Sequence, residues 1–213
     1  MRGKPTPGLA GTLICFAREP VAGQVKTRLI PALGAEGAAR LYRVLLDLAL
    51  RAGAELPGVE RELWCTGATP GGGRCAELAD RYGLALRHQP EGDLGERMES
   101  ALTETLARAG PAVLIGSDCP EYSPDYLASA FTVLETADAV LGPAADGGYV
   151  LIGLRRPTPA LFAHIPWGTG LVLERTRAAL RGLGWSWAEL PTLRDLDEPE
   201  DLRAFPEFAD AAR

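Results

Sequence analysis

Basic side chains are concentrated in one segment after the first apolar run of the chain. The segment reads FAREPVAGQVKTRL, from Phe16 to Leu29, and contains Arg18, Lys26 and Arg28. Proline and glycine interrupt it, so neither a strand nor a helix is expected to run through it. Backbone N–H groups and basic side chains bind phosphate oxygens, although most Arg and Lys side chains simply face solvent. A phosphate-binding loop and a solvated surface loop both remain possible from this segment alone.

Two acidic segments could contribute oxygen ligands to a metal ion. Asp118 directly follows an apolar run in the sequence IGSDCP, and DLDEPEDL spans Asp195–Leu202. A carboxylate after a strand can hold a hard divalent cation or can form a turn. Asp197, with Glu200 three residues later, can likewise be a second metal ligand or the N-cap of a helix.

A glycine-rich connection between two apolar runs is a further candidate. AADGG contains Asp146, Gly147 and Gly148. Asp-Gly is a strong signal for a hairpin turn. The same residues could form a backbone wall beside a ligand, with Asp146 as a hydrogen-bond acceptor or general base.

Two more segments could contact a flat or phosphorylated ligand. EGDLGERM contains Gly95 and Arg97, although Asp93 with Glu96 three residues later is also the pattern of an ordinary helix start. IPWGTG places Trp167 in a Pro/Gly turn, where the indole could stack on a base or sugar or could fill the edge of the core.

Strand-length apolar runs alternate with segments of helical periodicity along the chain. This alternation predicts an α/β fold with a mainly parallel sheet, and the length of 213 residues suits a single domain over 1–213. Ligands of such sheets bind beyond the carboxyl ends of the strands. We expect strands at 12–17, 59–67, 84–88, 112–116, 138–143, 149–154 and 185–190. We expect helices at 34–52, 94–110 and 170–181, a short helix that ends at 83, one that begins at 124 and a last one after 199.

The composition excludes several classes of function. A formal net charge of -6 argues against non-specific nucleic-acid binding, which needs a basic face. No apolar run has the length of a membrane span, so a cytoplasmic protein is expected. Cysteines without CxxC spacing indicate neither a zinc site nor a disulfide framework, and reduced thiols are predicted at Cys15, Cys65, Cys75 and Cys119.

Six segments, taken in order, resemble one known family. FAREPVAGQVKTRL, QPEGDLGERM, LIGSDCP, LGPAADGGYVLIGL, IPWGTG and LRDLDEPEDL resemble the DUF2064 family. Its members are regarded as glycosyltransferases of the nucleotide-diphospho-sugar transferase (GT-A) fold, some of them associated with radical-SAM or arsenosugar gene neighbourhoods. The resemblance therefore implies a three-layer α/β/α sandwich and a nucleotide-sugar-dependent transferase.

The resemblance also implies roles for individual residues. Asp118 and Asp197 would hold Mg²⁺ or Mn²⁺, and Asp118 and Asp146 would act in catalysis. The partners would be a nucleotide sugar and a small-molecule acceptor. Arg18, Lys26 and Arg28 would contact phosphates, and Asp93, Gly95 and Arg97 would contact the nucleotide. Gly147, Gly148 and Trp167 would contact the acceptor.

Two other functions stay open at this point. PVAGQVKTRL is similar to the basic loop of 2-phospholactate guanylyltransferases, and DLDEPEDL to the closing motif of molybdenum-cofactor guanylyltransferases. The alternative is therefore a nucleotidyltransferase that joins a nucleoside triphosphate to a phosphorylated small molecule. A nucleotide-sensing module without turnover is the non-enzymatic alternative.

Overall fold

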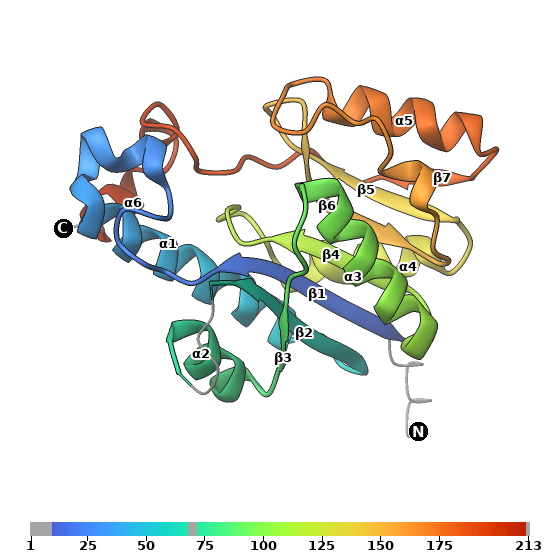
Figure 1. Ribbon diagram of the computed structural model, residues 1–213, viewed down its shortest axis with the longest axis horizontal. Coiled ribbons are helices and arrows are strands. Elements are labelled where there is room, and N and C mark those ends of the chain that lie inside the picture. Colours follow the sequence, from blue (N-terminus) through green and yellow to red (C-terminus); the bar gives the residue numbers. More distant parts are fainter. Residues whose placement is uncertain (1–9, 68–71, 212–213) are drawn as a thin grey trace, which may run out of the picture.

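The apolar runs form one seven-stranded sheet with helices on both faces (Figure 1). The computed structural model describes residues 10–67 and 72–211. Part of the glycine-rich turn expected before the second helix lies outside these residues. The strands are β1 Gly11–Arg18, β2 Val59–Thr66, β3 Ala85–His88, β4 Ala112–Gly116, β5 Ala139–Pro143, β6 Tyr149–Leu154 and β7 Trp187–Glu189.

The order of the strands creates a crevice beside β1. The sheet has the order β3-β2-β1-β4-β6-β5-β7, and all adjacent strands pair in parallel except that β6 is antiparallel to β4 and β5. The chain proceeds from β1 to β2 on one side, but β4 then pairs on the other side of β1. The direction of winding thus reverses between β1 and β4, which is where ligands of open α/β sheets bind.

Alternate side chains of β1 pack into two separate apolar cores. Leu13, Cys15 and Ala17 face the core beneath α1, α2 and α4, whereas Ile14 and Phe16 face the core beneath α3 and α5. The strand expected at 12–17 is therefore confirmed, and it is buried on both faces. The helices are α1 Ile30–Ala54, α2 Arg74–Tyr82, α3 Leu94–Ala109, α4 Pro124–Leu134, α5 Val172–Gly182 and α6 Pro206–Ala211, with 3-10 turns η1 Thr27–Leu29, η2 Pro159–Leu161 and η3 Asp201–Arg203.

The last segment of the chain returns to the beginning of α1. In Figure 1 it crosses from β7 over the edge of the sheet to the blue end of α1. Leu196 is fully buried there against Leu29 and Leu41, in an apolar cluster that also includes Phe205 and Phe208. This small core fixes the acidic segment around Asp197 next to the basic segment that precedes α1.

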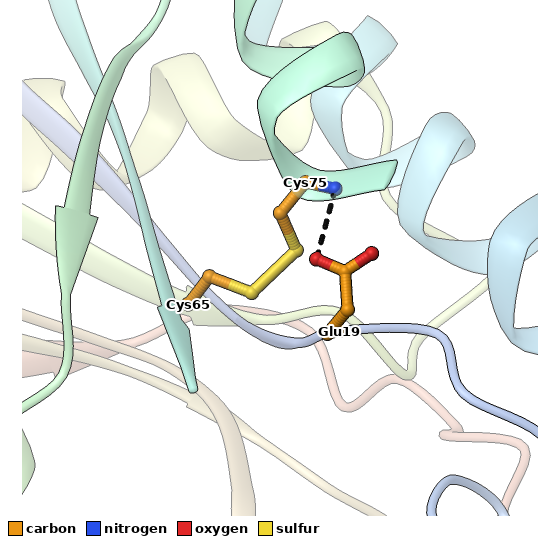
Figure 2. Close-up of side chains that lie close together, drawn as sticks. All are labelled: Glu19, Cys65 and Cys75. Carbon is orange, nitrogen blue, oxygen red and sulfur yellow. Dashed lines mark hydrogen bonds between the residues drawn. A yellow bond between two sulfur atoms is a disulfide. The ribbon is translucent and has the colours of Figure 1, made fainter. Parts of the chain in front are cut away.

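The predicted state of two cysteines is wrong. Cys65 at the end of β2 and Cys75 in the first turn of α2 form a disulfide (Figure 2), while Cys15 and Cys119 are free thiols. The pairing depends on how α2 packs against β2, which cysteine spacing does not reveal. In the part of the chain that the structure describes, no helix is long and apolar enough to cross a membrane, as expected from the sequence.

Candidate active site

A pocket of about 600 Å³ opens at the point where the winding direction reverses. It lies beyond the carboxyl ends of β1 and β4 and beside the turn between β5 and β6. Most of the predicted site residues line it, although they come from segments far apart in the sequence. The predicted residues among the lining are Arg18, Lys26, Arg28, Arg97, Asp118, Asp146, Gly148, Trp167 and Asp197.

Lys26 is the buried cation of this pocket. Its Nζ lies 2.6 Å from Oδ1 of Asp118 and 3.5 Å from Oδ1 of Asp197, and its side chain is only 2% exposed. The residue has φ 47° and ψ 43°, the left-handed conformation, which costs a non-glycine residue roughly 1–2 kcal/mol. The two ion pairs offset that cost and bring both predicted metal ligands to one positive charge.

The two arginines of the basic segment differ in how they are paired. Arg28 Nη1 lies 2.9 Å from Oδ2 of Asp197, in a solvent-exposed ion pair. The guanidinium of Arg18 has no hydrogen bond or ion pair with any residue that the structure describes. The backbone N–H of Arg18 donates to the Tyr42 hydroxyl at 2.8 Å, which is itself 2.8 Å from Ser117 Oγ. Arg18 is therefore fixed at its backbone and free at its charged end.

Asp195 also lines the pocket, although the sequence had pointed to Asp197 in the same segment. Burial, followed by the negative charges of Asp146 and Asp118, raises the pKa of the Asp195 carboxyl to about 6, while Lys26 opposes the rise. Negative charge is thus crowded on this side of the pocket. The dense carboxylates of DLDEPEDL were the available signal, and both Asp195 and Asp197 line the pocket.

The turn between β5 and β6 is both a hairpin and a wall of the pocket. Asp146 Oδ1 accepts a hydrogen bond from the backbone N–H of Gly148 at 2.8 Å, which orients the exposed carboxylate. Gly147 has φ 90°, and a Cβ there would overlap the carbonyl of Gly170. Its own carbonyl accepts from Leu173 N–H at 2.9 Å. Gly147 therefore acts as a packing residue and is not part of the lining.

Gly95 and Trp167 form a closely packed pair. A Cβ on Gly95 would overlap the indole nitrogen of Trp167, so the first turn of α3 can approach the ring only because residue 95 is glycine. The indole stacks on Phe162 and meets Tyr149 edge to face, with ring centroids 6.5 Å and 6.4 Å away. Gly95 supports the pocket from behind, while Trp167 contributes to its lining.

At the start of α3, Asp93 caps the helix and Arg97 lines the pocket. Asp93 caps the helix, because its carboxylate accepts from Glu96 N–H and the Glu96 carboxylate accepts from Asp93 N–H. It is not a lining residue. Arg97 does line the pocket and donates to Gln89 Oε1 at 3.4 Å. Gln89, another lining residue not singled out from the sequence, donates to the carbonyls of β1 and β2 at 2.9 Å and 2.8 Å.

The acidic side of the pocket carries the type of side chain that binds a divalent cation, but among the described residues only Glu19, Cys65 and Cys75 have three ligand atoms within 4.8 Å of one another. Asp118, Asp195 and Asp197 provide hard oxygen ligands of the kind that Mg²⁺ and Mn²⁺ prefer. The ammonium group of Lys26 already occupies a cation position between two of them.

Comparison with known proteins shows which family the chain belongs to. A family model described as "Uncharacterized protein conserved in bacteria (DUF2064)" matches residues 49–169, more than half of the chain. The chain belongs to the DUF2064 family. This DUF2064 protein is also similar, at 28% identity and a TM-score of 0.81, to a Desulfovibrio desulfuricans G20 structure provisionally described as a nucleotide-diphospho-sugar transferase; the match covers 94% of this chain and 96% of that one.

More distant structures share the fold. CMP:2-keto-3-deoxy-manno-octonic acid synthetase, solved with CTP, aligns at a TM-score of 0.57 and 9% identity over 94% of this chain and 99% of that one. A Mycobacterium tuberculosis H37Rv protein solved with manganese aligns at a TM-score of 0.54 and 18% identity, over 92% of this chain and 98% of that one. Comparison with curated proteins finds no match. The fold is therefore that of nucleotide-diphospho-sugar transferases, as the resemblance implied.

Proposed function

We propose that this protein, acting as one domain over 1–213, transfers a glycosyl group from a nucleotide sugar to a small-molecule acceptor. The observation that carries the proposal is the contact of Lys26 with Asp118 and Asp197 in the pocket that Arg18 also lines, where the Arg18 guanidinium has no partner among the described residues. Acidic and basic groups side by side suit a metal-bound diphosphate, which needs both oxygen ligands for the cation and donors for its own oxygens.

The residues divide the work of such a transfer between the two sides of the pocket. Arg18 and Arg97 would donate to diphosphate oxygens, and Trp167 would offer an apolar face to the sugar or base. Asp118, Asp195 and Asp197 would hold Mg²⁺ or Mn²⁺, which when bound offsets negative charge on the departing nucleoside diphosphate. Manganese in a structure of the same fold is consistent with this assignment.

Asp146 is the proposed base. In the reaction, the bond from the sugar anomeric carbon to the phosphate oxygen breaks, and a bond from that carbon to the acceptor oxygen forms. The acceptor's proton passes to the Asp146 carboxylate, whose Oδ1 is oriented by Gly148. A base positioned in this way commonly contributes about 10²–10⁴-fold to a rate.

Nucleotidyl transfer is the alternative, because the same fold serves a synthetase solved with CTP. A triphosphate would place more negative charge in the pocket than a diphosphate. Lys26 and Arg28 are already paired with carboxylates, which leaves Arg18 and Arg97 to meet that charge. This balance favours glycosyl transfer as the first proposal.

Thermal unfolding with a panel of ligands distinguishes the two functions. The panel contains sugar nucleotides, nucleoside diphosphates and nucleoside triphosphates, each with and without Mg²⁺ or Mn²⁺. A ligand at a hundred times its Kd stabilises the native state by about 2.7 kcal/mol. We expect metal-dependent stabilisation by a sugar nucleotide, followed by release of nucleoside diphosphate on turnover. Stabilisation by triphosphates alone, with pyrophosphate as product, would establish the alternative, and no shift with any ligand would contradict both.

A further inference from the structure

A second group of reactive side chains lies beside the candidate active site and is not explained by it. Figure 2 shows the Glu19 carboxylate beside the disulfide between Cys65 and Cys75, directed at the backbone nitrogen of Cys75. Both cysteines are fully buried, and Glu19 is partly buried. The three residues come from the segment after β1, the end of β2 and the first turn of α2.

Glu19 connects this group to the basic segment. Its carboxylate accepts hydrogen bonds from the backbone N–H groups of Arg74 at 2.5 Å and Cys75 at 3.3 Å. Its own N–H donates to the carbonyl of Thr66 at 2.8 Å. Glu19 is thus held on both sides of the disulfide, by the residue after Cys65 and by Cys75 itself. Arg18, with its unpaired guanidinium, is the adjacent residue.

The disulfide also lies next to Gln89, which holds the pocket residue Arg97. The backbone N–H of Gln89 donates to the carbonyl of Cys65 at 3.3 Å. The Gln89 side chain then accepts from Arg97. A second hollow, of about 390 Å³, is lined by Cys65, Gln89 and Arg97 together and opens beside the main pocket. The backbone around Cys65 is therefore in contact with both segments that deliver Arg18 and Arg97.

The fold itself does not require this covalent bond. Chains well above roughly 100 residues bury enough apolar surface to fold without disulfides. Here two extensive cores already cover the two faces of the sheet. A bond placed where β2, α2 and the basic segment meet is better explained by an effect on the pocket than by a need for stability.

We propose that Cys65 and Cys75 are a reversible thiol–disulfide site that sets the affinity of the pocket for phosphate groups. With the disulfide formed, the N-terminus of α2 stays in place and holds Glu19, which fixes Arg18. With the disulfide reduced, α2 is tied to β2 by non-covalent contacts alone, and Glu19 loses its rigid anchor. The affinity component of this inference rests on the proposed binding of a diphosphate.

The chemistry requires a thiol reductant of the dithiol class. A thiolate of the reductant attacks one cysteine sulfur, the bond between Cys65 and Cys75 breaks, and the other cysteine leaves as a thiolate. The second thiol of the reductant then displaces the protein sulfur. Two electrons and two protons end on the two cysteines, and the reductant leaves as its own disulfide. Because both sulfurs are buried, the N-terminus of α2 must open for this exchange.

Counting thiols tests the covalent part without any ligand. The protein is treated with an oxidised dithiol or with excess dithiothreitol, denatured, alkylated and weighed by mass spectrometry. We expect two alkylated cysteines after oxidation, Cys15 and Cys119, and four after reduction. Four alkylated cysteines under both conditions would overturn the inference.

Calorimetric titration with magnesium pyrophosphate tests the effect on the pocket. We expect the reduced protein to bind roughly five- to tenfold more weakly, the scale of losing one typical intramolecular hydrogen bond. The double variant Cys65→Ala/Cys75→Ala should match the reduced protein and ignore oxidant. Glu19→Ala should bind weakly in both states. Cys15→Ala, which removes a buried thiol elsewhere, should keep the response to oxidant.

The outcomes separate this inference from the proposed function. Equal affinity of the oxidised and reduced wild-type protein overturns the inference alone. No binding of pyrophosphate in either state, with thiol counts that change as expected, contradicts the proposed function and the affinity component together. Tight binding of Zn²⁺ by the reduced protein through Glu19 and the two thiols, with unchanged pyrophosphate affinity, overturns the inference in favour of a metal site.

Discussion

The two sides of the pocket are held in place by different forces. The charged wall consists of Lys26, Asp118 and Asp197, joined by ion pairs. The packed wall consists of Gly95 and Trp167, joined by close van der Waals contact. Both walls bring together segments distant in sequence. Only the charged wall is held by groups, the carboxylates and the ammonium, that a ligand could also bind.

This difference assigns a separate task to each wall. The carboxylates of Asp118 and Asp197 are 47% and 39% exposed, so they can exchange Lys26 for a cation without rearranging the core. The indole of Trp167 is fixed between Phe162 and Tyr149 and cannot move without disturbing its neighbours. The charged wall is suited to binding and chemistry, and the packed wall to defining the shape of the pocket.

The largest expected effect is at the centre of the charged wall. Asp118→Asn keeps the size of the side chain and removes its charge, so we expect turnover to fall roughly a hundredfold or more. The fold should persist, because Lys26 keeps Asp197 as a partner. Steady-state kinetics and circular dichroism measure the two effects. Asp125→Asn, at an exposed carboxylate on α4, is the control, and full turnover by Asp118→Asn would remove Asp118 from the mechanism.

Gly95→Ala should damage the packed wall. The added Cβ would overlap the Trp167 ring, which is packed against Phe162 and Tyr149, and we expect a loss of about 1–3 kcal/mol in the free energy of unfolding. Urea denaturation measures it. Gly182→Ala is the matched control, because a Cβ there would enter open space at the end of α5. Equal stability of the two variants would show that the contact is not tight.

Lys26→Met tests how strongly the ion pairs hold the charged wall. The change removes a buried ammonium but relieves no backbone strain, and the partly exposed carboxylates can rehydrate. We therefore expect a loss of about 1–2 kcal/mol, below the range for a fully buried pair. Chemical denaturation at low and high salt measures it. A loss as large as that of a fully buried ion pair would mean that the carboxylates are not free to bind a cation.

The smallest effect on stability is expected at Arg28. Its pair with Asp197 is exposed, so Arg28→Ala should change the free energy of unfolding by less than about 1 kcal/mol. Arg81→Ala breaks a similar exposed pair with Asp47, far from the pocket. Both variants should be equally stable, and calorimetric titration should show nearly unchanged binding of a nucleoside diphosphate in each, because Arg28 is already paired with Asp197. Weaker binding in Arg28→Ala alone would add Arg28 to the residues that contact phosphate.

Local sequence signals predicted the elements of the fold well. The apolar run of β1, the start of α4 at 124 and the end of α2 near 83 each depend on residues close in the sequence, so they can be predicted along the chain. The position of the pocket followed from the alternation of strands and helices. The roles of single residues within it did not follow equally well.

The missed features all depend on contacts between distant segments. Gly95 and Trp167 were both candidates, but nothing in either segment revealed that one makes room for the other. Asp195 and Asp197 are of the same type and two residues apart, and only the backbone path determines which is more buried. The bond between Cys65 and Cys75 likewise follows from the docking of α2 on β2.

The return of the last segment to α1 has a consequence for the protein during its synthesis. Lys26 and Asp197 are separated by 171 residues, so at ribosomal speeds of roughly 5–20 residues per second about 10–30 s pass between them. In that interval the growing chain carries Arg18 and Lys26 but not the acidic segment around Asp197. A newly synthesised chain can therefore begin to assemble its sheet well before the lining of its pocket is complete.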